Sequence, residues 1–202
     1  MNILIKNANL ISMEEKRDIY EENIDILIKD KEIYKIGRDI KLDNEDVKII
    51  DATGKYIIPG FINTHAHVPM SIFRETIDGY NLQDWLEKKI WPMEDKLLPQ
   101  DIYYSTLLSG IEMIKTGTTT INDMYFLSEN SIKAVLELGV RMQTTRTLMS
   151  LNDEKKSRIS ELEELINEYN DKSDLITFNI GIHGLYTTES NYLKESIKLA
   201  DK

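Results

Sequence analysis

The segment "PGFINTHAHVPM", residues 59–70, places two of the chain's three histidines, His65 and His67, directly after a run of apolar residues. Successive side chains of a β-strand point to opposite faces, so histidines at positions i and i+2 share one face. A single histidine at a strand end is usually a solvated polar residue, but two imidazoles on one face can converge on one ion. We therefore interpret His65 and His67 as metal ligands. Neutral imidazole favours Zn²⁺, Fe²⁺ or Ni²⁺ over Ca²⁺ or Mg²⁺.

The composition excludes several classes of protein and site. The 202 residues are 41% hydrophobic and 30% charged, which suffices for one large core or two small ones. A formal net charge of -10, with no cluster of basic residues, argues against a nucleic-acid partner. The absence of cysteine excludes disulfides, thiolate metal sites and cysteine nucleophiles. No stretch resembles a signal peptide or a membrane helix, so we expect a cytoplasmic protein without a membrane partner.

The N-terminal part of the chain has the alternating pattern of β-strands. Ile24, Ile26 and Ile28 alternate on one face, and Asp30 with Lys31 follows them as a turn. The strand-like stretches are residues 2–11, 23–37 and 47–61. We predict a small antiparallel sheet module, which occupies residues 1–56.

From residue 57 onward, strand-like runs alternate with helix-like runs, as in βα units with a parallel sheet. The predicted strands are 56–65, 118–125, 140–149 and 175–185, and the predicted helices are 101–115, 128–138, 157–170 and 191–202. The first strand is not followed by the Gly-rich phosphate loop that a doubly wound sheet usually has. We therefore favour an α/β fold in which residues 57–202 are the first four βα units of a (β/α)8 TIM barrel. A complete barrel takes about 250 residues, so we expect the chain to be the N-terminal portion of a longer protein.

In the predicted helix 101–115, the apolar residues indicate which face is buried. Its apolar residues recur at helical spacing, so we expect them to face the core. They are Ile102, Leu107, Leu108, Ile111 and Ile114.

Two further polar residues lie near strand ends, and each admits two interpretations. Catalytic zinc generally takes three protein ligands, so His65 and His67 need others. His183, near the end of the fourth strand, can be the third ligand or can contact the substrate. Asp123, near the end of the second strand, can belong to the site or can cap a loop. The residue pattern leaves both questions open.

Two stretches, residues 49–97 and "GTTTINDMY" at 117–125, resemble the amidohydrolase superfamily. Within it, they are most similar to the branch of 5-methylthioadenosine/S-adenosylhomocysteine deaminases and related ATZ/TRZ-type chlorohydrolases. The resemblance covers nearly the whole chain. It implies a composite β-sandwich built from both chain ends, a metal-dependent (β/α)8 barrel, and one divalent metal ion, zinc before iron or nickel. It places His65 and His67 as the first two metal ligands.

The same resemblance assigns residues to a nucleoside substrate. Glu94, in "WPMED", matches a carboxylate that binds the ribose hydroxyls. Arg146 and Arg158 match arginines that meet the amino-acid carboxylate of S-adenosylhomocysteine, a planar anion that suits a guanidinium fork. His183 matches a histidine that contacts substrate rather than metal. The family commonly has Pro-His-x-Pro at this place, whereas this chain has "IHGLY", so the loop after His183 departs from the family.

The resemblance implies hydrolytic deamination of adenosine derivatives to inosyl products and ammonia, with a small-molecule nucleoside as the partner. In the family, the remaining metal ligands and the proton-shuttling glutamate fall after the position of Lys202. We therefore assign no catalytic residue within residues 1–202 and expect this portion by itself to be inactive. Assembly into a homo-oligomer is compatible with the sequence.

Two alternatives remain. One is another amidohydrolase that acts on a C–N or C–Cl bond of a nucleobase or triazine, for example a guanine-deaminase-like enzyme. The other is a non-catalytic half-barrel protein. Glu94, together with Arg146 and Arg158, favours the nucleoside deaminase, because an enzyme that acts on a base alone needs neither ribose nor carboxylate contacts.

Overall fold

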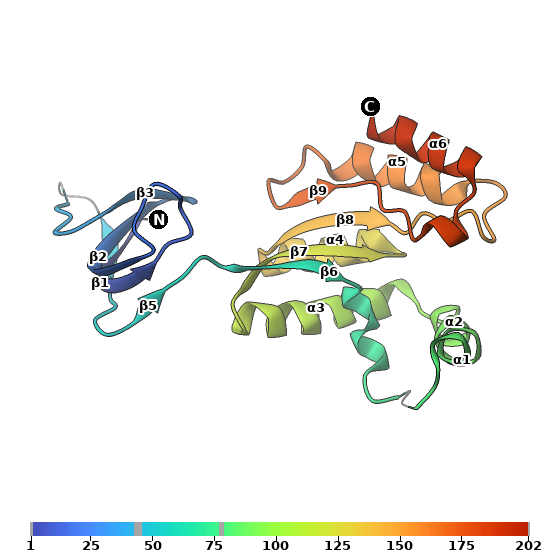
Figure 1. The fold of residues 1–202 in the computed structure, drawn as a ribbon, viewed down its shortest axis with the longest axis horizontal. Helices are drawn as coiled ribbons and strands as arrows, with labels where there is room; N and C mark the ends of the chain where they lie inside the picture. Colours follow the sequence, from blue (N-terminus) through green and yellow to red (C-terminus); the bar gives the residue numbers. More distant parts are fainter. Residues whose placement is uncertain (1, 43–45, 77–78, 202) are drawn as a thin grey trace. The chain divides into compact units, whose positions relative to one another are not determined.

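The computed structural model describes residues 2–42, 46–76 and 79–201 (Figure 1). The chain forms two compact units, one that ends at Pro59 and one that begins at Gly60.

The first unit is a five-stranded sheet with the order β3-β2-β1-β4, in which β5 also pairs with β1. Its strands are β1 (Asn2–Ile11), β2 (Tyr20–Lys29), β3 (Glu32–Gly37), β4 (Val47–Asp51) and β5 (Tyr56–Ile57). The β2–β3 hairpin turns at Asp30, which has a left-handed φ of 54°. The prediction of an antiparallel module is correct for β1, β2 and β3 but wrong for β4 and β5. Both run parallel to β1, because the chain returns along the other edge of β1 instead of continuing the meander.

The boundary between the units divides a stretch that we predicted to be one strand, residues 56–65. Tyr56 and Ile57 pair with β1, so a domain boundary between residues 56 and 57 would cut through β5. Pro59, which lacks an N–H group to donate to a ladder, separates β5 from the first strand of the second unit. At Gly60 the backbone passes very close to the next strand, since a Cβ there would lie 2.3 Å from the Thr119 side chain.

The second unit has the predicted βα alternation and a four-stranded parallel sheet with the order β6-β7-β8-β9 (Figure 1). The strands are β6 (Phe61–Ala66), β7 (Thr118–Tyr125), β8 (Arg141–Arg146) and β9 (Ile176–Phe178). The helices that follow them are α3 (Pro99–Lys115), α4 (Ser128–Leu138), α5 (Ser157–Tyr169) and α6 (Ser190–Ala200). Within the described ranges, no helix is both long and apolar enough to span a bilayer.

Between β6 and α3 the chain makes a helical excursion. A 3₁₀ turn, η1 (Val68–Phe73), follows β6, and a helical segment made of α1 (Leu82–Trp85), η2 (Leu86–Ile90) and α2 (Trp91–Glu94) comes later. The middle element, η2, is a π-helical turn, in which the amide of Trp91 donates to the carbonyl of Leu86. A second 3₁₀ turn, η3 (Leu185–Thr187), lies between β9 and α6.

The main core of the second unit lies between the sheet and its helices. It includes Val68, Ile121, Ile132, Val135, Val140, Met142, Tyr169 and Ile176. In β7, Ile121, Asp123 and Tyr125 are buried, whereas the residues between them are only partly buried. Asp123 and Tyr125 therefore share the helix-covered face of the sheet with Ile121.

The predicted core face of α3 is wrong except at Ile102, which is fully buried. Leu107 is partly buried, and Leu108, Ile111 and Ile114 are exposed. The buried face consists instead of small residues, Ser105, Thr106, Ser109 and Gly110. Small side chains let the helix approach its neighbours closely. A Cβ on Gly110 would lie 2.3 Å from the Leu138 side chain of α4.

Candidate metal and substrate site

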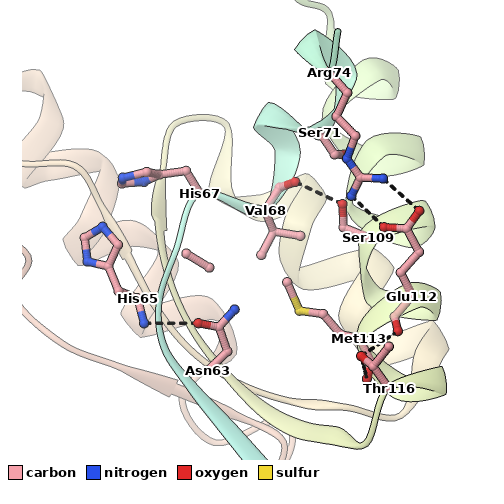
Figure 2. Close-up of a pocket in the computed structure, with 11 residues that line it drawn as sticks. Asn63, His65, His67, Val68, Ser71, Arg74, Ser109, Glu112, Met113 and Thr116 are labelled. Carbon is pink, nitrogen blue, oxygen red and sulfur yellow. Dashed lines mark hydrogen bonds and ion pairs between the residues drawn. The ribbon is translucent and has the colours of Figure 1, made fainter. Parts of the chain in front are cut away.

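His65 lies near the end of β6, and His67 follows the strand directly. Their rings lie edge to face with the centroids 5.0 Å apart, on the same side of the strand (Figure 2). A pocket of about 490 Å³ opens beside them. It is lined by Asn63, His65, Ala66, His67, Val68, Ser71, Arg74, Ser109, Glu112, Met113 and Thr116. The shared face that the i, i+2 spacing predicts therefore brings the two imidazoles together.

The orientation of the His67 ring is fixed by a backbone carbonyl. Its Nδ1 lies 2.7 Å from the carbonyl oxygen of Met124. A carbonyl oxygen can only accept, so Nδ1 carries the hydrogen of this bond; in a neutral imidazole this leaves the lone pair on Nε2, the arrangement that metal-binding histidines usually show.

The distance between the rings also fits a shared metal ion. Two imidazoles that bind one tetrahedral zinc through nitrogens about 2.0–2.1 Å from it would have ring centroids about 5 Å apart. Among the residues that the structure describes, no third His, Asp or Glu joins the pair in a metal-binding cluster. His65 and His67 thus fit as two ligands of an imidazole-bound metal, and His183 is not brought beside them as a third.

Asp123 holds a loop in place, which is the second of the two roles considered above. Its side chain is only 1% exposed and lies on the helix-covered face of β7. Its Oδ1 accepts a 2.7 Å hydrogen bond from the amide of Val68, and burial raises the pKa of the carboxyl to about 6. Asp123 therefore fixes the backbone immediately after His67.

Glu94 is the last residue of α2, and Tyr125 connects it to the end of β7. The Tyr125 hydroxyl donates to Oε1 of Glu94 at 2.6 Å. Burial raises the pKa of Glu94, while the hydrogen bond from Tyr125 and the nearby His67 ring act in the opposite direction. Glu94 therefore lies within electrostatic range of the His67 ring.

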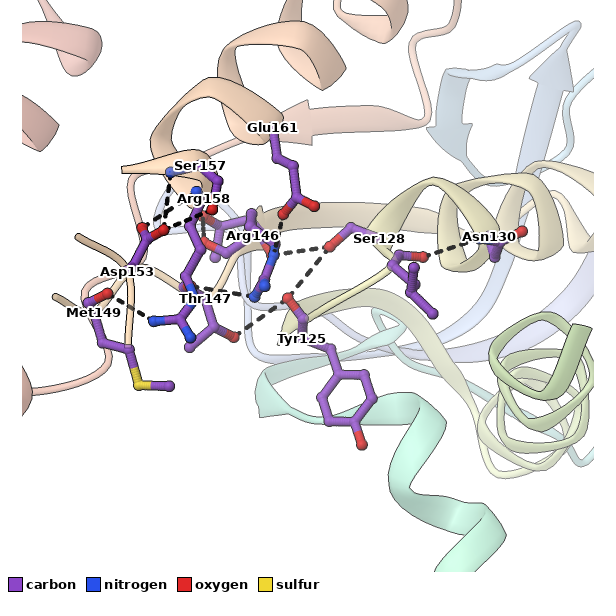
Figure 3. A network of polar contacts seen from close by, with 12 residues as sticks. Tyr125, Ser128, Asn130, Arg146, Thr147, Met149, Asp153, Ser157, Arg158 and Glu161 are labelled. Carbon is purple, nitrogen blue, oxygen red and sulfur yellow. Dashed lines mark hydrogen bonds and ion pairs between the residues drawn. The ribbon is translucent and has the colours of Figure 1, made fainter. Parts of the chain in front are cut away.

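Arg146 ends β8 and Arg158 lies in the first turn of α5, and the protein supplies acceptors to each (Figure 3). Nε of Arg146 pairs with Oε2 of Glu161 at 2.5 Å, and the Arg146 side chain is 16% exposed. Nη1 of Arg158 donates to the carbonyls of Met149 and Leu151, both at 2.8 Å. No acceptor among the described residues takes the Nε and Nη2 hydrogens of Arg158, which leaves donors of that guanidinium for a ligand.

Asp153 anchors the start of α5, from which Arg158 projects (Figure 3). Its carboxylate accepts from the Ser157 amide at 2.8 Å, the Ser157 hydroxyl at 2.6 Å, the Arg158 amide at 3.3 Å and the Tyr192 hydroxyl at 2.7 Å. Burial alone would raise the pKa of Asp153, but these hydrogen bonds outweigh it and lower the pKa. The carboxylate therefore stabilises the helix N-terminus and, through it, the position of Arg158.

His183 follows β9, where its amide donates to the carbonyl of Leu148 at 2.9 Å. Its Nδ1 lies 3.0 Å from the Thr187 hydroxyl. Burial lowers the pKa of His183, and the charges of His67 and Arg158 lower it further. His183 is thus within electrostatic range of both His67 and Arg158.

Comparison with known proteins assigns this arrangement to a family. Residues 56–202 match the model of the amidohydrolase family. The chain belongs to this family. A curated amidohydrolase relative, the 5-methylthioadenosine/S-adenosylhomocysteine deaminase of Thermoanaerobacter pseudethanolicus, is 43% identical over 99% of this chain and 47% of its own length. The 5'-deoxyadenosine deaminase of Methanocaldococcus jannaschii is 42% identical over 99% of this chain and 46% of its own length. The chain thus spans about half the length of the curated relatives it matches.

Solved structures support the amidohydrolase fold. Atrazine chlorohydrolase from Arthrobacter aurescens, complexed with zinc, superposes with a TM-score of 0.87 at 22% identity, over 98% of this chain and 50% of that one. An adenosine deaminase from Xanthomonas campestris with bound zinc gives 0.85 at 22% identity, over 98% and 46%. The fold of this amidohydrolase is therefore that of the first half of a TIM barrel preceded by a strand-rich module.

Three contributors to the amidohydrolase site were missed from the sequence: the Met124 carbonyl, the Tyr125 hydroxyl and the Asp153 carboxylate. Every residue has a backbone carbonyl, so the sequence does not indicate that the one of Met124 binds His67. Tyr125 gave a usable signal, because a tyrosine at the end of a buried strand needs a partner for its hydroxyl. Asp153 gave another, because an acidic residue shortly before a helix can accept from its first amides.

Proposed function

We propose that the full-length protein is a metal-dependent hydrolytic deaminase of adenosine derivatives, with 5-methylthioadenosine, S-adenosylhomocysteine and 5'-deoxyadenosine as the candidate substrates. The observation that carries the proposal is the identity of 37–43% over 99–100% of this chain to relatives named as 5-methylthioadenosine/S-adenosylhomocysteine deaminases. Relatives named as 5'-deoxyadenosine deaminases, at 40–42% identity, extend the same substrate class.

His65 and His67 would provide two ligands to a divalent metal, for which zinc is the first candidate. The fixed ring of His67 and the distance between the two rings support this assignment. When bound in such a site, zinc lowers the pKa of a coordinated water toward about 7 and so supplies a nucleophile at neutral pH.

The other side chains would hold the nucleoside. Glu94 would accept hydrogen bonds from the ribose hydroxyls. The free donors of Arg158 would meet the carboxylate of an S-adenosylhomocysteine-like substrate, and Arg146 would add positive charge that Glu161 partly neutralises. His183, whose amide is held by the carbonyl of Leu148, would contact the adenine end of the substrate.

The test is ammonia release by the purified full-length protein. The panel contains 5-methylthioadenosine, S-adenosylhomocysteine, 5'-deoxyadenosine, guanine and a chlorinated triazine, the last assayed for chloride release. We expect turnover of at least one of the three nucleosides and none of guanine or the triazine. A matched pair of variants tests the site: Glu94→Gln should raise KM for nucleosides, while Glu154→Gln, an exposed acid of the β8–α5 loop, should leave KM unchanged. Turnover of guanine or the triazine alone would refute the proposal.

A further inference from the structure

Tyr125 connects two parts of the candidate site through its hydroxyl. It is the last residue of β7, its side chain is 5% exposed, and its ring stacks on Phe126 with the centroids 4.4 Å apart. Its hydroxyl donates to Oε1 of Glu94 across 31 positions of sequence. The aromatic body is thus held rigidly in the fold, and the polar tip faces the residue proposed to bind ribose.

The neighbours of Tyr125 in β7 hold the metal side of the site. Asp123 accepts from the amide of Val68, and the Met124 carbonyl accepts from His67. Three consecutive residues of β7 therefore make these contacts: Asp123 holds the backbone at Val68, Met124 holds the His67 ring, and Tyr125 holds Glu94. A strand advances only about 3.3 Å per residue and β7 is paired on both edges, so the imidazole and the carboxylate are held in a constant relation.

The hydrogen bond also determines which part of Glu94 faces a ligand. A carboxylate has two oxygens and about four acceptor directions. Tyr125 occupies Oε1, and no residue in the described part of the chain donates to Oε2. Burial raises the pKa of Glu94, and the hydrogen bond from Tyr125 offsets part of that rise. A pair of neighbouring hydroxyls, as on a ribose, can donate to the remaining acceptor positions of such a carboxylate.

We propose that Tyr125 is a positioning residue that orients Glu94 and thereby makes the enzyme selective for nucleosides with free 2' and 3' hydroxyls. The proposal rests on the proposed function and adds a specificity determinant to it. Tyr125 acts through Glu94 and does not itself touch the substrate.

The experiment compares Tyr125→Phe with a matched control in the full-length protein. Tyr103→Phe removes a hydroxyl of the same kind, which bonds to Glu137 on the α3–α4 surface. The substrates are 5-methylthioadenosine and its 2',3'-dideoxy analogue. For Tyr125→Phe we expect KM for the ribonucleoside to rise about tenfold with kcat within twofold, because the acceptor Glu94 is no longer held in one orientation. KM for the dideoxy analogue should stay unchanged, and Tyr103→Phe should alter neither value.

A double-mutant cycle separates positioning from a general structural role. If Tyr125 acts through Glu94, Tyr125→Phe should add nothing in a Glu94→Gln background. Equal increases in KM for both substrates, or additive effects in the cycle, would overturn the inference while leaving the deaminase proposal intact. A wild-type protein that deaminates none of the three nucleosides named under the proposed function would overturn that function, and the inference with it.

Discussion

Asp153→Asn should destabilise the protein by about 3–6 kcal/mol at pH 7. The carboxylate accepts four hydrogen bonds, from Ser157, Arg158 and Tyr192, and its side chain is 4% exposed. Hydrogen bonds to a charged group contribute about 1.5–3 kcal/mol each. An amide retains one oxygen as an acceptor and turns an NH₂ group toward donors, so we count about two such bonds as lost.

The effect should depend on pH with a defined sign. The hydrogen bonds hold the pKa of Asp153 below its ordinary value, which is about 3.9 in an unfolded chain. The wild-type carboxylate therefore contributes its full stabilisation above about pH 4 and loses it as the pH falls through the lower, folded-state pKa. The difference in free energy of unfolding between wild type and Asp153→Asn should accordingly shrink in acid.

The assay is urea unfolding of the full-length protein at pH 7 and near pH 3, followed by far-UV circular dichroism. Glu154→Gln, one residue away and exposed, is the control and should shift the free energy of unfolding by less than about 0.5 kcal/mol. A shift for Asp153→Asn as small as that of the control would refute the reasoning. So would a difference that stays constant between the two pH values.

Three other outcomes follow from the structure. His67→Ala should abolish binding of a stoichiometric zinc ion, measured by elemental analysis after dialysis, whereas His183→Ala should retain it; loss of zinc in His183→Ala would make His183 a ligand after all. Gly181→Ala would place a Cβ 2.2 Å from Cγ2 of the stiff, buried Thr145 and should lower the free energy of unfolding in urea by about 1–3 kcal/mol. Gly37→Ala is the control, because a Cβ there would have no atom within 4 Å, and it should leave the free energy of unfolding nearly unchanged. Residues 1–202 expressed by themselves should self-associate, because Phe61 and Ile62 of the edge strand β6 are exposed; a monodisperse monomer by light scattering would contradict this.

The βα alternation and the histidine pair could be predicted because both depend on local periodicity. His65 and His67 share a face because of their spacing along one segment, and only the orientation of the His67 ring depends on another strand, through the Met124 carbonyl. The face of α3 could not be predicted, because close packing of Ser109 and Gly110 against neighbouring elements prevailed over the apolar stripe. Hydrophobic periodicity identifies apolar residues but not which helix face its neighbours can approach most closely.

The polar contacts of the substrate side depend on residues far apart in sequence. Arg146 pairs with Glu161 across the β8–α5 loop, and Glu94 meets Tyr125 only because the excursion after β6 returns to the end of β7. No residue pattern within either segment specifies the partner in the other. The roles of Glu94, Arg146, Arg158 and His183 therefore stay predictions that depend on the family resemblance.

The π-helical turn η2 lies immediately before the four-residue helix that ends in Glu94. A π turn contains more residues than an α turn, and each residue of an α-helix advances the side-chain direction by about 100°. Removal of one residue between Leu86 and Ile90 would let this turn close in α geometry and rotate Glu94 away from Tyr125. A change in chain length, with no substitution at Glu94 or Tyr125, would thus break their hydrogen bond and, with it, the ribose contact proposed above.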